Sequence, residues 1–189
     1  LQDDAAFIRE TTGYNMQNSD IGVELGFEPG NWSSSVAITN GTQGSNENNK
    51  DKQYSLTTSY QQPEYRIGFS LGANKAPNSL KSTAINLFGG YNLGKLELFG
   101  NDMKKFNLLA EVDFIKQESG SDIDIDQLVS YLGFNYAYSK DINIKFDYQY
   151  FDPNRAISED ESTRYNIAVE MFVHQIFQIR AGIRVLDSI

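Results

Sequence analysis

Cysteine is absent from the 189 residues, and His174 is the single histidine. The lack of cysteine excludes disulfide bonds, thiol catalysis and cysteine-based zinc sites. One histidine excludes sites built from paired histidines and disfavours a Ser-His-Asp triad. Gly89-Gly90 lies inside a strand pattern, so no glycine-rich phosphate loop is present. We therefore expect no enzyme, no resident metal and no cofactor.

Long apolar runs are also missing. No stretch approaches the roughly 18 apolar residues of a spanning helix, and the mean hydropathy is −0.46. This excludes transmembrane helices but leaves open a β-barrel, whose strands are only half apolar. The net charge of −9 argues against nucleic acid as a partner. No signal peptide is visible at Leu1, so we expect a mature or truncated chain.

Alternating apolar and polar residues are what the sequence does contain, most clearly from Gln127 to Tyr150. Two alternating arms of about ten residues flank the short break Ser139–Asp141, which predicts a β-hairpin long enough to cross a bilayer. The apolar positions of its arms are Leu128, Leu132, Phe134, Tyr136 and Tyr138, then Ile142, Ile144, Phe146, Tyr148 and Tyr150.

The same alternation recurs along the chain and predicts ten antiparallel strands in one β-barrel domain, residues 1–189. Residues 1–19 are predicted to be a loop, and residues 20–187 to hold the strands. The stretch from Thr83 to Phe99 fits two phases, which a bulge near Gly94 would join. Short connections, predicted as periplasmic turns, alternate with long polar ones, predicted as outer loops. The short ones are Pro29–Asn31, Gln61–Glu64, Asn101–Lys105, Ser139–Asp141 and Val173–Ile176.

Aromatic residues concentrate near the strand ends of the apolar face, with aliphatic residues mostly between them. This pattern predicts two girdles around an aliphatic band, as in outer-membrane barrels. One girdle, near the short turns, comprises Phe27, Trp32, Tyr60, Tyr65, Phe106, Tyr138 and Phe177. The other, near the long loops, comprises Tyr54, Phe114, Tyr150 and Tyr165. A soluble β-sandwich or lipocalin-like barrel is the alternative, in which the apolar face is the core.

Six short motifs stand out, at residues 7–14, 22–30, 37–41, 86–90, 148–153 and 178–182. They resemble the porin-like outer-membrane barrels of Gram-negative bacteria, in the group of the phosphate-selective porins. The resemblance implies a bacterial outer-membrane protein, surrounded by lipid and lipopolysaccharide, with a homo-oligomer such as a trimer as a candidate assembly. Such barrels usually close with a strand ending in an aromatic residue, whereas this chain stops at Leu186-Asp187-Ser188-Ile189. We therefore expect a fragment of a larger barrel that lacks its closing strand.

If the apolar face meets lipid, the polar face lines a lumen. Its predicted charged members balance in sign, so no excess of cations points to an anion-selective constriction. Glu170 and Arg180 are predicted to lie opposite each other, and a structural ion pair is favoured over a selectivity element. The charged members are Glu24, Arg66, Glu111, Asp113, Lys145, Asp147, Arg164, Glu170, Arg180 and Arg184.

Two acidic runs, Ser121–Asp126 and Glu159–Glu161, could bind divalent cations, but solvated loops are the favoured interpretation because the glycine and glutamate of a calcium loop are missing. The sequence thus predicts an outer-membrane channel for passive diffusion of small hydrophilic solutes or ions. Small polar residues would line its path: Ser33, Ser35, Ser55, Thr57, Ser59 and Ser70. The alternatives are a scaffold barrel that houses a plug or an electron-carrier partner, and a soluble ligand-binding β-barrel.

Overall fold

The computed structural model describes residues 20–41, 51–75, 81–95, 106–118, 124–174 and 177–188. These residues form ten β-strands and one short 3-10 turn, η1 (Leu93–Lys95). Within the described ranges, no helix is long and apolar enough to span a membrane. The strands are β1 (Gly22–Phe27), β2 (Trp32–Thr39), β3 (Gln53–Gln61), β4 (Tyr65–Lys75), β5 (Lys81–Asn92), β6 (Phe106–Glu118), β7 (Asp124–Ala137), β8 (Ile142–Asp152), β9 (Ser162–His174) and β10 (Phe177–Ser188).

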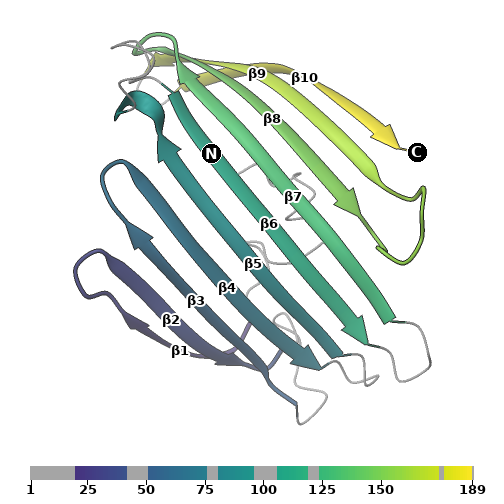
Figure 1. Ribbon diagram of the computed structural model, residues 1–189. Helices are drawn as coiled ribbons and strands as arrows, with labels where there is room; N and C mark the ends of the chain where they lie inside the picture. The colour runs from purple at the N-terminus through teal and green to yellow at the C-terminus, as the bar shows by residue number, and fades with distance from the viewer. Residues whose placement is uncertain are drawn as a thin grey trace.

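All ten strands belong to one twisted sheet in which each strand pairs with its neighbours in the chain (Figure 1). Every pairing is antiparallel, from β1 with β2 through to β9 with β10. This up-and-down order confirms the predicted fold class. It follows directly from the alternation, because hairpin-connected strands with one apolar face pair most simply with their sequence neighbours.

The register sorts side chains onto two faces, as the period of two requires. The outer face carries an apolar row that crosses seven strands: Leu25, Val36, Leu56, Leu71, Ile85, Phe114 and Leu128. The inner face carries most of the charged residues. Large apolar side chains of the outer face are exposed, Leu25 and Ile183 each by 73%, while Glu170 and Gln149 on the inner face are each 1% exposed.

The separation of the two faces is less strict than the sequence suggests. Ser34 and Thr58 lie on the outer face, where their hydroxyl groups hydrogen-bond to each other at 2.6 Å. On the inner face, Ala84, Ile115 and Val129 form a small buried apolar cluster, against which Tyr131 and Phe151 pack. The inner face is therefore not polar throughout, and part of it is packed like a protein core.

Several strands are longer than predicted at the end of the long connections. β6 continues to Glu118 and β7 begins at Asp124, so most of the described part of the predicted acidic loop is strand. Polar residues can extend a strand beyond the apolar band because the ladder hydrogen bonds are independent of the side chain. At the opposite end, β9 runs to His174, which was predicted to lie in a turn.

The predicted bulge near Gly94 is wrong. β5 ends at Asn92, whose side-chain Oδ1 accepts a hydrogen bond from the backbone N–H of Gly94 at 3.0 Å. This is the local hydrogen bond by which asparagine starts a turn, and η1 follows. Leu96, Leu98 and the predicted short turn Asn101–Lys105 lie outside the described residues.

Aromatic rings line the outer face near the short turns of β1 to β5. Trp32, Tyr60, Tyr65 and Tyr91 follow one another with centroid separations of 5.0, 6.1 and 6.5 Å. A second series joins Phe106, Tyr136 and Tyr138, at 4.3 and 6.4 Å. These contacts agree with the predicted girdle at this end. Toward the other end, Tyr165 packs on Tyr148 at 5.1 Å.

Gly68 offers a test of how tightly the inner face is packed. A Cβ atom there would lie 2.5 Å from Cζ of Phe88 and 2.6 Å from the carbonyl oxygen of Thr58. We expect Gly68→Ala to lower the free energy of unfolding by about 1–3 kcal/mol, the usual cost of overpacking. The measurement is urea unfolding of the protein folded in lipid vesicles. Gly26→Ala is the matched control, because nothing lies within 4 Å of its added Cβ; equal losses would contradict the packing.

Candidate functional site

All ten charged residues that were predicted to share a face do so. The register places them on the inner face of the sheet, although their exposure to a lumen remains a prediction. They come from six strands: Glu24 on β1, Arg66 on β4, Glu111 and Asp113 on β6, Lys145 and Asp147 on β8, Arg164 and Glu170 on β9, Arg180 and Arg184 on β10.

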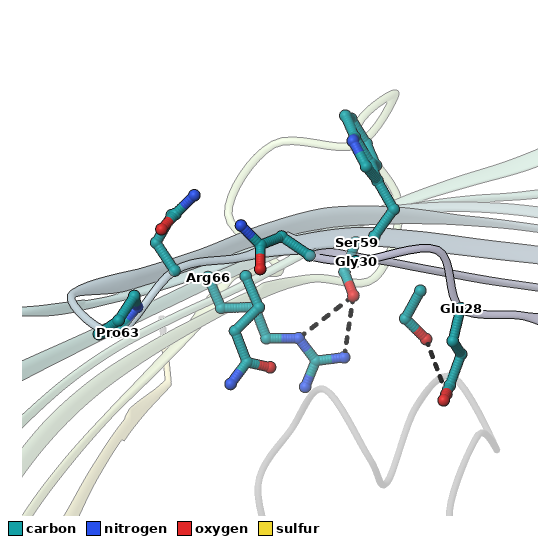
Figure 2. A pocket seen from close by; sticks show the side chains of 10 residues that line it. Glu28, Gly30, Ser59, Pro63 and Arg66 are labelled. Atoms are coloured by element: carbon teal, nitrogen blue, oxygen red, sulfur yellow. Dashed lines mark hydrogen bonds between the residues drawn. The ribbon is translucent and has the colours of Figure 1, made fainter.

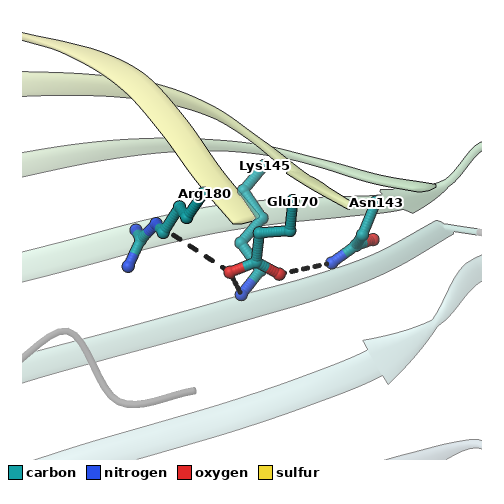
Figure 3. Close-up of polar contacts among 4 residues, drawn as sticks. All are labelled: Asn143, Lys145, Glu170 and Arg180. Carbon is teal, nitrogen blue, oxygen red and sulfur yellow. Dashed lines mark hydrogen bonds and ion pairs between the residues drawn. The ribbon is translucent and has the colours of Figure 1, made fainter. Parts of the chain in front are cut away.

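Glu170 is the centre of the first cluster (Figure 3). Its Oε1 accepts a hydrogen bond from Lys145 Nζ at 2.8 Å and lies 3.9 Å from Arg180 Nε, and its Oε2 accepts from Asn143 Nδ2 at 3.2 Å. The predicted Glu170–Arg180 pair is thus in register, but Lys145 from β8 is the nearer cation. Side chains from β8 and β10 thus contact one carboxylate on β9, and we infer that this cluster stabilises the pairing of the three strands.

Asp147 anchors a second cluster on the same strands. Its Oδ1 accepts hydrogen bonds from Gln149 Nε2 at 2.7 Å and from Asn166 Nδ2 at 2.6 Å. Arg184 Nε in turn donates to Asn166 Oδ1 at 2.9 Å. Asp147 and Asn166 are buried. The amide of Asn166 therefore links a cation on β10 to a carboxylate on β8.

Glu111 and Asp113 share a partner on β5. Asn86 Nδ2 donates to Glu111 Oε1 at 2.7 Å and to Asp113 Oδ1 at 2.6 Å. The sequence interpretation missed Asn86, Asn143 and Asn166 because its lining residues were charged residues and small hydroxyl residues, without asparagines. The signal that could have found them was their spacing: each occupies an inward position of an alternating strand.

A different lining covers β1 to β4. The small polar residues predicted for the path, Ser33, Ser35, Ser55, Thr57, Ser59 and Ser70, all face inward. Thr57 Oγ1 donates to Ser70 Oγ at 3.1 Å. Glu24, the charged residue of β1, is exposed. The inner face is therefore divided into a small-residue sector and a crowded, hydrogen-bonded sector on β5 to β10.

A hollow of about 580 Å³ lies where the small-residue sector meets the short turns (Figure 2). Arg66 lines it and donates from Nε and Nη2 to Ser59 Oγ at 3.4 and 3.2 Å, while its guanidinium carbon lies 5.4 Å from the ring centroid of Phe88. Glu28 also lines it, and its Oε1 accepts from Ser33 Oγ at 3.4 Å. Glu28 was missed in the sequence because it follows the last residue of β1.

The acidic runs do not form a metal centre in the part of the chain that the structure describes, where no group of three or more potential ligands is placed to hold an ion. Asp124 and Asp126 belong to β7, and Arg155 Nη1 lies 3.4 Å from Asp126 Oδ2. Asp122 lies outside the described residues, as does the side chain of His174.

Comparison with known proteins identifies the fold. No protein-family model and no curated protein matches the sequence. A solved porin matches with a TM-score of 0.68 and 14% identity, covering 88% of this chain and 56% of the porin. OmpT, an outer membrane protein of Vibrio cholerae, matches with a TM-score of 0.52 and 18% identity, covering 76% of this chain and 46% of OmpT.

This chain has the outer-membrane β-barrel fold. It spans about half the length of the solved barrels it matches. Neither match tests the resemblance to the phosphate-selective porins, which remains a prediction.

Removing the charge of Glu170 should reveal the structural role of its cluster. Glu170→Gln leaves Lys145, 21% exposed, and Arg180, 41% exposed, without their shared carboxylate. Breaking a partly buried pair of this kind costs about 1–3 kcal/mol, less than a fully buried one. We expect a loss of this size in the free energy of unfolding, measured by urea titration in lipid vesicles. Glu24→Gln is the control, since Glu24 is exposed and its substitution should change stability by less than about 0.5 kcal/mol. Similar small effects for both variants would contradict the stabilising role of the Glu170 cluster.

Proposed function

We propose that this chain forms part of a channel in the bacterial outer membrane, through which small hydrophilic solutes or ions diffuse passively along the inner face. The observation that supports this most directly is that solvent exposure is the reverse of that in a water-soluble protein. The apolar outer face is the exposed one, and the polar inner face holds buried groups such as Asp113, Asp147 and Glu170. A protein surrounded by water rarely exposes a continuous apolar surface of this extent.

The hydrocarbon core of a lipid bilayer suits an outer face of this kind. Exposed apolar side chains occur on strands across the sheet, from Val23 on β1 to Val185 on β10. The hydrogen-bond ladders pair β2 to β9 on both sides, as the hydrocarbon core demands, and pair β1 and β10 on one side within the described residues. The soluble alternative would need the apolar face to be a core, and the exposure of Leu87 and Ile67, 52% and 56%, speaks against it.

The inner face supports weak charge selectivity. Lys145 and Arg180 share Glu170, and Arg184 is linked through Asn166 to Asp147, so these charges are engaged in holding strands together. The small-residue sector of β1 to β4 leaves room beside them for water and solute. The arrangement requires no chemical step, and the function that we propose is transport without catalysis.

Planar-bilayer recording tests the channel directly. The full-length protein, extracted from outer membranes with detergent, should insert and give ion-conducting steps with weak preference between anions and cations. Boiled and unboiled samples should differ in gel mobility, as expected of a closed barrel. A folded, membrane-embedded protein without conductance would reject the channel in favour of a scaffold barrel filled by a partner. Release without detergent would reject both.

Leu87 offers a point test of the lipid-facing surface. It lies on β5 between Phe69 and Val112 in the outer-face register. Leu87→Arg should lower the free energy of unfolding in lipid vesicles by about 2–4 kcal/mol if this position lies near the bilayer midplane. Ser35→Arg on the inner face should have a much smaller effect, because its charge would meet water. Equal losses, measured by urea titration in the same vesicles, would contradict the assignment of the two faces.

A further inference from the structure

Arg66 differs from Lys145 and Arg180 in having no carboxylate partner among the described residues. Its interactions within the described residues are with the Ser59 hydroxyl and the Phe88 ring, both neutral. A guanidinium has five N–H donors, so Ser59 leaves others available. Lys145 and Arg180, in contrast, converge on Glu170. Arg66 therefore keeps its full positive charge at the hollow that it lines.

The position of this guanidinium is set by packing. Phe88 can approach β4 because Gly68 has no side chain, and its ring lies beneath Arg66. Two hydrogen bonds to Ser59 on β3 hold the guanidinium from another direction. A charged group held in this way loses little conformational entropy when a ligand binds.

Glu28 supplies the opposite charge. Its recorded partner among the described residues is the Ser33 hydroxyl, at a long 3.4 Å, and no cation of the described residues lies within ion-pair distance. Glu28 and Arg66 line the same hollow, yet no ion pair joins them. Two opposite charges thus face one space without neutralising each other (Figure 2).

The remaining lining is uncharged and includes several amide groups, and the hollow has a size suited to a small solute. Asn31, Gln61 and Gln62 contribute amide groups that can both donate and accept hydrogen bonds. The volume of about 580 Å³ lies within the roughly 300–1,000 Å³ that is usual for small-molecule sites.

We propose that this hollow binds zwitterionic solutes of the amino-acid or short-peptide class, with Arg66 contacting the carboxylate and Glu28 the ammonium group. A simple anion would be attracted by Arg66 but repelled by Glu28. A simple cation would be attracted by Glu28 but repelled by Arg66. A molecule that carries both charges interacts favourably with both residues. The proposal rests on the channel function, because solute reaches the hollow from the inner face.

Isothermal titration calorimetry provides the readout. Trp32 borders the hollow, but its ring packs on Tyr60 in the outer-face series, so its fluorescence does not report directly on solute at the inner face. The full-length protein, folded in detergent micelles, is titrated with glycylglycine, and we expect a saturable heat of binding. N-acetylglycylglycine, which lacks the ammonium group, and glycylglycinamide, which lacks the carboxylate, should each bind about tenfold more weakly, the effect of losing one charged hydrogen bond.

Charge-neutralising variants complete the test. Arg66→Gln and Glu28→Gln should each weaken glycylglycine binding by about tenfold. The matched controls are Lys140→Gln and Asp141→Asn, which should leave binding unchanged. These two residues form an exposed ion pair on the β7–β8 turn, with their charged atoms 3.8 Å apart. Equal binding of the blocked dipeptides, or unaltered binding by the Arg66 and Glu28 variants, would overturn the site.

Conductance separates this proposal from the channel itself. A conducting protein with no saturable heat of glycylglycine binding would reject the binding site and leave the channel in place. A non-conducting protein that still binds glycylglycine through Arg66 and Glu28 would reject the channel and leave the binding site. A variant whose boiled and unboiled samples still differ in gel mobility has folded. Loss of binding by such a variant is therefore not caused by misfolding.

Discussion

The antiparallel hydrogen-bond ladder from β1 to β10 is the constraint on which the rest of this structure depends. Because side chains alternate along each strand, a register shift of one residue would move every apolar side chain to the opposite face. The register keeps Leu25, Leu71 and Phe114 in one row of the outer face. The same register brings Glu170 opposite Arg180 on the inner face. Lipid contact and polar clustering are thus two results of one pairing pattern.

The inner face combines two kinds of wall. On β5 to β10, carboxylates such as Glu170 and Asp147 are surrounded by amide and cationic donors from neighbouring strands, which satisfies groups that would be costly to bury alone. On β1 to β4, small hydroxyl residues leave space, and Arg66 and Glu28 keep charges that no ion pair neutralises within the described residues. One wall serves stability, and the other leaves groups available for solute.

The sequence interpretation was accurate where a feature follows from local alternation. It predicted ten strands, the faces of all ten charged residues and the opposition of Glu170 and Arg180. It failed where a single side chain overrides the pattern: Asn92 ends β5 by bonding to the backbone of Gly94, where a bulge was expected. It also missed Glu28, because alternation does not show in which direction a side chain beyond the end of a strand points.

By itself, the sequence determined the fold class, the two faces and the up-and-down order, since these depend on a period of two and on short connections between neighbours. The tertiary structure alone decided which polar groups meet. The selection of Lys145 as the nearer partner of Glu170, and the linking of Arg184 to Asp147 through Asn166, depend on distances across three strands. Alternation assigns a residue to a face, but contact within that face depends on the twist and stagger of the paired strands.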